Sequence, residues 1–137
     1  MTMTKKSLDE LTYKIIGAAI QVHRELGPGL LESAYHKCLG HELLSIGLTV
    51  RSEVSVPIIY KGINFNSDLR CDLIVNEAIV VELKSVEILA PVFTAQLLSY
   101  MRLLQVPKGI LINFNCANIF KEGQRTFVNH LFRNLPA

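Results

Sequence analysis

A strand, a helix and a second strand follow one another between residues 78 and 114, and this order restricts the folds open to the chain. The first strand, AIVVELKSV, is rich in β-branched residues. The helix begins at Pro91 and ends before Pro107, because proline suits a first helical turn but cannot continue a helix. The second strand, GILINF, is almost wholly apolar, as expected of a strand buried on both faces. The pattern predicts a helical crossover in an α/β sheet.

Two helices and two further strands are predicted before this unit. Residues 7–26 carry apolar side chains at spacings of three and four, opened by a capping-box pattern at Ser7 and Glu10. A second helix follows the GPG stop at 27–29 and runs to about Ile46. The strands EVSVPIIY, 53–60, and INFNSDLRCDLIV, 63–75, are joined by a Lys61-Gly62 turn. The tail, 119–132, fits a hairpin or a terminal helix.

The predicted fold is therefore a single α/β domain over residues 1–137, in the order α-α-β-β-β-α-β. A mixed central sheet of about four strands is flanked by helices. The chain has 137 residues, half of them hydrophobic and 19% charged, which suits one globular core. No apolar run approaches the ~18 residues of a membrane helix, so we expect a cytoplasmic protein without membrane contact.

The charge balance permits nucleic-acid binding without demanding it. The formal net charge is only +2, whereas strongly basic binding domains usually have a pI above about 9. Residues 102–137, however, hold five basic residues against one acidic residue. This C-terminal excess is compatible with phosphate contacts.

Charged residues stand within the two apolar strands at 71–85, and the turn between the strands decides how they face. Glu82 and Lys84 share a face because they are two positions apart. With a two-residue turn at 76–77, Asp72 would point away from Glu82. A three-residue loop at 76–78 instead sets Asp72 directly opposite Glu82.

Two carboxylates placed face to face repel one another unless a positive charge lies between them. Mg²⁺ prefers oxygen ligands and is commonly held by one or two carboxylates together with phosphate oxygens. Asp72 and Glu82 therefore suit a metal site, in which Lys84 would orient or deprotonate an attacking water. The alternative is a solvated strand face with a Glu82–Lys84 pair, in which Asp72 lies on the opposite face or turns toward solvent.

Two motifs resemble a known family of nucleases. Asp72, nine intervening residues and ELK at 82–84 resemble the core of the PD-(D/E)xK nuclease superfamily, although Cys71 replaces the proline of the name. GLLESAY, at 29–35, is similar to the signature of the GxxExxY proteins, a bacterial and archaeal branch of that superfamily. The resemblance implies a restriction-endonuclease-like core that hydrolyses phosphodiester bonds in DNA with Mg²⁺ or Mn²⁺ bound at Asp72 and Glu82.

The resemblance also implies further site residues. Glu32 would touch the metal through water, although the helix dipole alone favours an acid in a first turn. Gln96 and Tyr100 resemble a Gln-x-x-x-Tyr element that flanks the metal and contacts substrate, but a polar helix edge explains them equally well. The remaining histidines outside the first helix belong to no recognisable constellation: His36, His41 and His130.

Two functions from different classes remain. The first is a Mg²⁺-dependent nuclease acting on DNA, and the second is a non-catalytic nucleic-acid-binding or assembly module that retains the nuclease fold. A chain of this length leaves little room for a separate recognition domain, so help from a protein partner or from a homo-oligomer is expected. The sequence has no Gly-rich phosphate loop and no zinc-ligand spacing.

Overall fold

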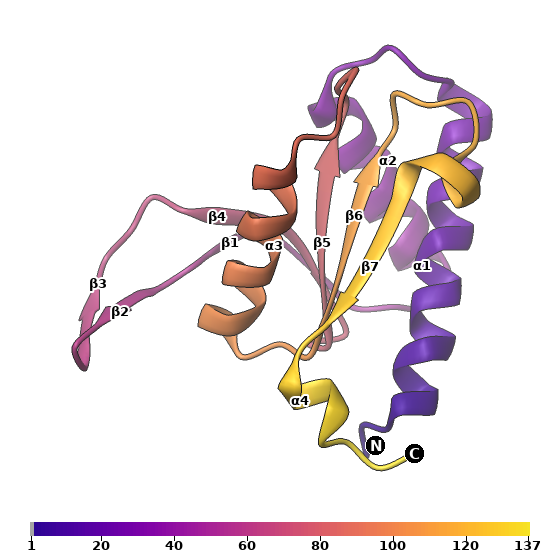
Figure 1. The fold of residues 1–137 in the computed structure, drawn as a ribbon. Helices are drawn as coiled ribbons and strands as arrows, with labels where there is room; N and C mark the ends of the chain where they lie inside the picture. The colour runs from indigo at the N-terminus through magenta and orange to yellow at the C-terminus, as the bar shows by residue number, and fades with distance from the viewer. Residues whose placement is uncertain (1) are drawn as a thin grey trace.

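A five-stranded mixed sheet forms the centre of the computed structural model, which describes residues 2–137 (Figure 1). The strand order is β1-β4-β5-β6-β7, and every neighbouring pair is antiparallel except β5 and β6. The predicted crossover is confirmed, because α3 connects the parallel strands β5 and β6. The strands are β1 Val50–Ser55, β4 Arg70–Val75, β5 Ile79–Lys84, β6 Lys108–Asn113 and β7 Gln124–Val128.

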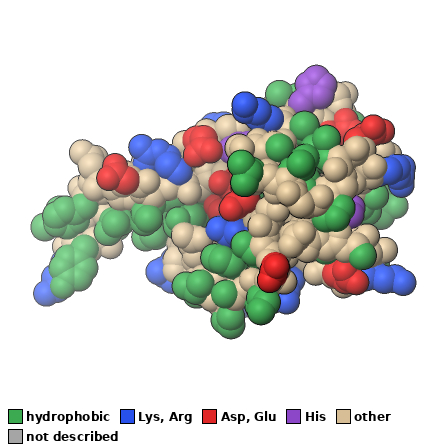
Figure 2. Space-filling view, turned by 90° about the horizontal axis from the view of Figure 1, so that it is seen from above, with side chains coloured by type: hydrophobic (Ala, Val, Ile, Leu, Met, Phe, Trp, Pro, Cys, Tyr) green, Lys and Arg blue, Asp and Glu red, His purple; other side chains and the backbone are tan. Residues whose placement is uncertain are grey.

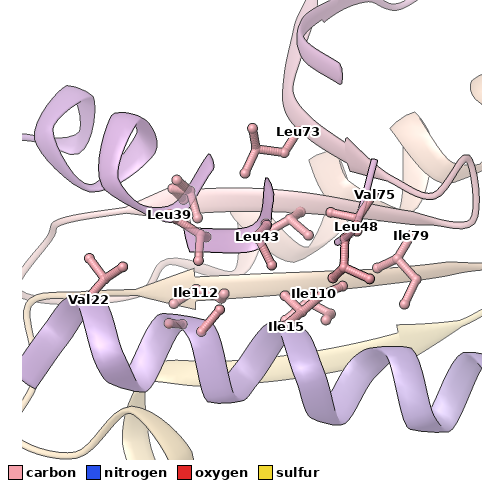
Figure 3. Close-up of a cluster of buried hydrophobic side chains, with 14 of the residues drawn as sticks. Ile15, Val22, Leu39, Leu43, Leu48, Leu73, Val75, Ile79, Ile110 and Ile112 are labelled. Atoms are coloured by element: carbon pink, nitrogen blue, oxygen red, sulfur yellow. The ribbon is translucent and has the colours of Figure 1, made fainter. Parts of the chain in front are cut away.

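Helices cover both faces of this sheet. Helices α1, Lys5–Leu26, and α2, Glu32–Ser45, pack on one face, and α3, Pro91–Leu104, packs on the other. Figure 3 shows the first of these cores, where side chains of α1 and α2 meet the strands: Ile15, Val22, Leu39, Leu43, Ile110 and Ile112. Burial of these large aliphatic side chains is the main favourable contribution to the fold. Within residues 2–137, no helix has the length and apolar character needed to cross a bilayer.

The first helix begins earlier than predicted. Its N-cap is Thr4, whose side chain accepts a hydrogen bond from the Ser7 backbone, while Ser7 Oγ accepts one from the Thr4 backbone. The predicted box at Ser7 and Glu10 is therefore wrong by one helical turn. Thr4 and Ser7 satisfy the N–H groups of the N-cap and N3 positions with their hydroxyl oxygens, as a Ser–Glu pair does in the usual capping box.

The strands predicted at 53–60 and 63–75 are each interrupted. Their distal parts form a separate two-stranded ribbon, β2, Ile58–Tyr60, and β3, Ile63–Phe65, which projects from the body as an arm (Figure 1). Pro57 stands at the first break, where it has no N–H to donate to a ladder. The predicted two-residue turn at Lys61-Gly62 is confirmed, because Tyr60 pairs with Ile63.

For the tail, the sequence left a hairpin and a terminal helix open, and the structure has one strand followed by one short helix. A single π-helical turn, η1, Ile119–Gly123, leads into β7, and the short helix α4, His130–Arg133, follows. β7 pairs antiparallel with β6 and raises the number of sheet strands from the predicted four to five. β7 therefore forms one edge of the sheet, and β1 forms the other.

Candidate metal centre

The loop between β4 and β5 has three residues, 76–78, because Val75 pairs with Ile79. Of the two turns that the sequence left open, the structure has the three-residue loop on which the acidic pair depends. The same register sets Asp72 opposite Glu82, since side chains on paired strands follow the pairing. The two carboxyl groups therefore meet on neighbouring strands.

Pairing between β4 and β5 ends at Leu73 and Val81, one position before the two acids. Beyond that pair, each carboxyl group bonds the main chain of the other strand. The Asp72 backbone N–H donates to Glu82 Oε1 at 3.0 Å, and the Leu83 backbone N–H donates to Asp72 Oδ2 at 2.7 Å. These crossed bonds hold both carboxyl groups at the point where the ladder ends.

Several ionisable groups around this point have raised pKa values. Glu82 is 4% exposed, and its pKa is raised to about 8, first by burial and then by the charge of Asp72. Burial, followed by the nearby Glu82 and Asp72, likewise raises the pKa of the Cys71 thiol to about 12. The Tyr100 pKa is raised by burial and then by Glu82. A cation at this point would relieve the repulsion.

Two residues that the sequence did not indicate lie beside Asp72. One donor atom each from His36, Glu53 and Asp72 falls within 4.8 Å of the others, and His36 Nδ1 is 3.4 Å from Glu53 Oε1. The register of β1 and β4 sets Glu53 opposite Asp72. Glu53 has a φ of 52°, and left-handed backbone at a non-glycine residue is often found at functional sites.

The statement that His36 belongs to no constellation is therefore wrong. His36 lies one helical turn after Glu32, so the two share a face of α2. That spacing is visible in the sequence, but the approach of α2 to β1 is not, because it depends on tertiary packing. Glu53 required the β1–β4 register, which no turn signal fixes.

The remaining predicted site residues lie on α2, on α3 and at the end of β5. Glu32 is the first residue of α2 and is exposed, outside the cluster of His36, Glu53 and Asp72. Lys84 is the last residue of β5, and its Nζ lies 4.4 Å from the centre of the Phe93 ring. Such a contact stabilises an ammonium group in one position.

Gln96 and Tyr100 lie together on α3. Gln96 Nε2 donates to the Tyr100 hydroxyl at 3.0 Å. Glu82 is among the charges that raise the Tyr100 pKa, so this helix brings the phenol close to the acidic pair. The predicted Gln-x-x-x-Tyr pair is thus joined by a hydrogen bond on the α3 side of the sheet.

Tyr35, the tyrosine of the GLLESAY motif, lies in the hydrophobic core. Tyr35 is fully buried, and its ring stacks on Phe114 with centroids 4.3 Å apart. Its hydroxyl donates to the Gly27 carbonyl at 2.6 Å and accepts from the Leu30 backbone N–H at 3.1 Å. Tyr35 therefore fixes the loop that precedes α2, and with it the position of Glu32.

The surface view agrees with this arrangement. Figure 2 shows acidic side chains gathered with a basic one where the projecting arm joins the body. The strands β1 and β4, which carry Glu53 and Asp72, lead directly into that arm. Glu53 is exposed and His36 and Asp72 are half-buried, so solvent reaches this cluster, whereas Glu82 is buried.

Comparison with known proteins gives one match. A profile described as the PD-(D/E)XK nuclease superfamily matches residues 9–126, which is most of the chain. The chain matches no curated protein and no solved structure. The matched span contains Asp72, Glu82 and Lys84 together with all five strands of the central sheet except the end of β7. The chain therefore belongs to the PD-(D/E)XK nuclease superfamily.

Proposed function

We propose that this protein is a metal-dependent nuclease that hydrolyses phosphodiester bonds in DNA. The observation that carries the proposal is the position of Asp72 opposite Glu82 at the end of the β4–β5 ladder. Lys84 follows Glu82 by two positions on the same strand. Membership of the nuclease superfamily supports the same chemistry. The GLLESAY motif at 29–35 further favours the GxxExxY branch.

The side chains suit a hard divalent cation, Mg²⁺ or Mn²⁺. Asp72 and Glu82 supply carboxylate oxygens, the donors that these ions prefer. Burial and then the charge of Asp72 raise the Glu82 pKa, and a bound cation would stabilise the charged form of the pair. His36 and Glu53 reach Asp72 from the β1 side and offer further donors. An imidazole donor favours Mn²⁺ over Mg²⁺.

Lys84 would act on the attacking water. It shares a strand face with Glu82, so its ammonium group stands beside the acidic pair, and Phe93 restricts its position. A positioned lysine orients water and offsets the charge that grows on a phosphate in the transition state. A bound metal supplies Lewis-acid activation of the phosphate and of water.

Gln96, Tyr100 and Glu32 would complete the site. The hydrogen-bonded Gln96–Tyr100 pair lies on the α3 side, where it would contact the nucleic acid beside the metal. Glu32, exposed at the start of α2 and one turn before His36, would hold a metal-bound water. The basic excess of residues 102–137 supports DNA as the substrate.

Metal titration tests the site without a guess about the substrate. We expect wild type to bind Mn²⁺ in calorimetry and Asp72→Asn to lose most of this binding. Asparagine keeps an acceptor for the Leu83 N–H, so the fold should survive. Glu25→Gln, on the exposed part of α1, is the matched control and should bind as wild type does.

Cleavage assays then test the reaction. Wild type with Mg²⁺ or Mn²⁺ should cut single- or double-stranded DNA, and EDTA or Asp72→Asn should stop it. Absence of cleavage on both substrates, or activity that survives Asp72→Asn, would refute the proposal. DNA binding that persists in EDTA, weakens with salt and is unchanged by Asp72→Asn would select the non-catalytic binding module instead.

A further inference from the structure

Asn113 is a buried polar residue at the end of β6, whose six residues are all buried. It is 7% exposed, and an amide in such a position costs free energy unless its polar atoms are bonded. It stands beside Lys84, because the two residues are register partners at the ends of the parallel strands β6 and β5. The buried amide therefore lies one strand away from the lysine that would act on water.

The Asn113 side chain bonds the main chain that follows Lys84. Its Oδ1 accepts from the Val86 backbone N–H at 3.1 Å, and its Nδ2 donates to the Val86 carbonyl at 3.0 Å. The same Oδ1 also accepts from the Asn115 backbone N–H at 3.2 Å. One amide thus holds both polar backbone groups of Val86, two positions after the lysine.

These bonds continue the pairing of β5 and β6 past the last residue of each strand. The Phe114 backbone N–H donates to the Lys84 carbonyl at 2.9 Å. Residues 85–90 then form the connection to α3 and belong to neither a helix nor a strand. Here the Asn113 side chain supplies to Val86 the donor and the acceptor that a neighbouring strand would otherwise provide. The backbone on the C-terminal side of Lys84 is therefore fixed to β6.

The connection held by Asn113 joins the two residues of the Lys84 contact. Lys84 precedes the connection, and Phe93 follows it in the first turn of α3. Lys84 Nζ lies 4.4 Å from the centre of the Phe93 ring. A shift of residues 85–90 would move the ammonium group relative to Phe93 and relative to Glu82, the acid on the same strand face. A misplacement of about 1 Å can cost about 100-fold in rate.

We infer that Asn113 is a positioning residue for Lys84. Its amide holds Val86 and thereby keeps the lysine ammonium group over Phe93, beside the acidic pair. The inference rests on the proposed nuclease function, in which Lys84 acts on the attacking water. Asn113 acts through the backbone and touches neither the metal nor the DNA, so its loss should slow the reaction without weakening either ligand.

Nuclear magnetic resonance of protein labelled with ¹³C at the lysine Cε tests the positioning and requires no activity. In wild type the Phe93 ring should move the Lys84 Hε signals upfield, and Lys84→Arg identifies these signals by their loss. Phe93→Leu should return them to the ordinary lysine position, and Asn113→Ala should move them most of the way there. Asn113→Asp keeps the two bonds accepted by Oδ1 and loses only the bond to the Val86 carbonyl, so its signals should lie between those of wild type and Asn113→Ala. This milder variant decides the question if Asn113→Ala does not fold.

Asn129→Ala is the matched control, because it removes similar bonds at the other end of the same crossover. Asn129 Nδ2 donates to the Val106 carbonyl, and its Oδ1 accepts from the Leu131 backbone N–H, both at 3.0 Å. Urea denaturation should show that both alanine variants are less stable than wild type. The Lys84 signals and kcat of Asn129→Ala should nevertheless stay as in wild type.

Steady-state cleavage assays measure the consequence for the reaction. Asn113→Ala should lower kcat about tenfold or more, while KM for DNA and calorimetric Mn²⁺ binding stay as in wild type. Lys84 signals that stay in place in Asn113→Ala, or that move equally in Asn129→Ala, would overturn the inference, and so would an unchanged kcat. A wild type that cuts no DNA would count against the nuclease instead, and the Lys84 signals would still decide whether Asn113 positions the lysine.

Discussion

Replacing Tyr35 with phenylalanine removes one oxygen atom and isolates the contribution of the two hydrogen bonds that hold the loop before α2. The ring still stacks on Phe114, so packing is conserved. The Gly27 carbonyl loses a donor at 2.6 Å, and the Leu30 N–H loses an acceptor at 3.1 Å. Each such bond contributes about 0.5–1.5 kcal/mol net.

The expected total follows from the exposure of the two backbone groups. Leu30 is exposed and Gly27 is half-buried, so water replaces part of what the hydroxyl supplied. We therefore expect Tyr35→Phe to lower the free energy of unfolding by about 1–2 kcal/mol, in the lower half of the range for two bonds. At ~4 °C per kcal/mol for a domain of this size, the melting temperature falls by about 4–8 °C.

Urea denaturation with matched thermal melts measures this change. The control is Tyr13→Phe, because Tyr13 is 81% exposed on α1 and its hydroxyl is in water. The control should differ from wild type by less than about 0.5 kcal/mol. If Tyr35→Phe is no less stable than Tyr13→Phe, the hydroxyl does not anchor the loop and this account of the motif's tyrosine is wrong.

Three further predictions concern the site and its support. Lys84→Ala should abolish DNA cleavage while Mn²⁺ calorimetry and circular dichroism stay as in wild type, because the ammonium group acts on water rather than on the metal. In EDTA, urea denaturation should show stability falling as pH rises from about 4.5 to about 8. The unfolded chain releases the Glu82 proton near its ordinary pKa, whereas the folded chain keeps it to about 8, and Glu82→Gln should remove this slope. Gly109→Ala should cost about 1–3 kcal/mol in the same assay, since its Cβ would lie 2.6 Å from Met101 Sδ on α3. Gly17→Ala, with open space around its Cβ in α1, should instead be neutral or stabilising.

The sequence was enough to place Asp72 and Glu82 on neighbouring strands, but it left two registers open. Residues 73–75 and 79–81 are apolar on both faces of the sheet, so no alternation selects the three-residue loop that the structure has. The strand GILINF was predictable because its side chains leave no polar face, and residues 108–113 are all buried. These features depend on neighbours close in sequence.

Other features depend on packing between distant segments, and the sequence did not reveal them. His36 and Glu53 meet only because α2 lies over β1, 17 positions further along the chain. The sequence predicted two long strands in the region of the arm because strand-forming apolar residues stand on both sides of each break, at 56–57 and at 66–69. A pattern of side chains reports strand propensity but not where a strand leaves its sheet.

The three-residue loop at 76–78 has a consequence for how this sequence can vary among its relatives. Loss or gain of one residue there would turn Asp72 to the other face of the sheet and separate it from Glu82. The β2–β3 arm has no such constraint, because a hairpin lengthened by two residues keeps the alternation of its faces. Length differences among active relatives should therefore fall in the arm, while the spacing from Asp72 to Glu82 stays fixed.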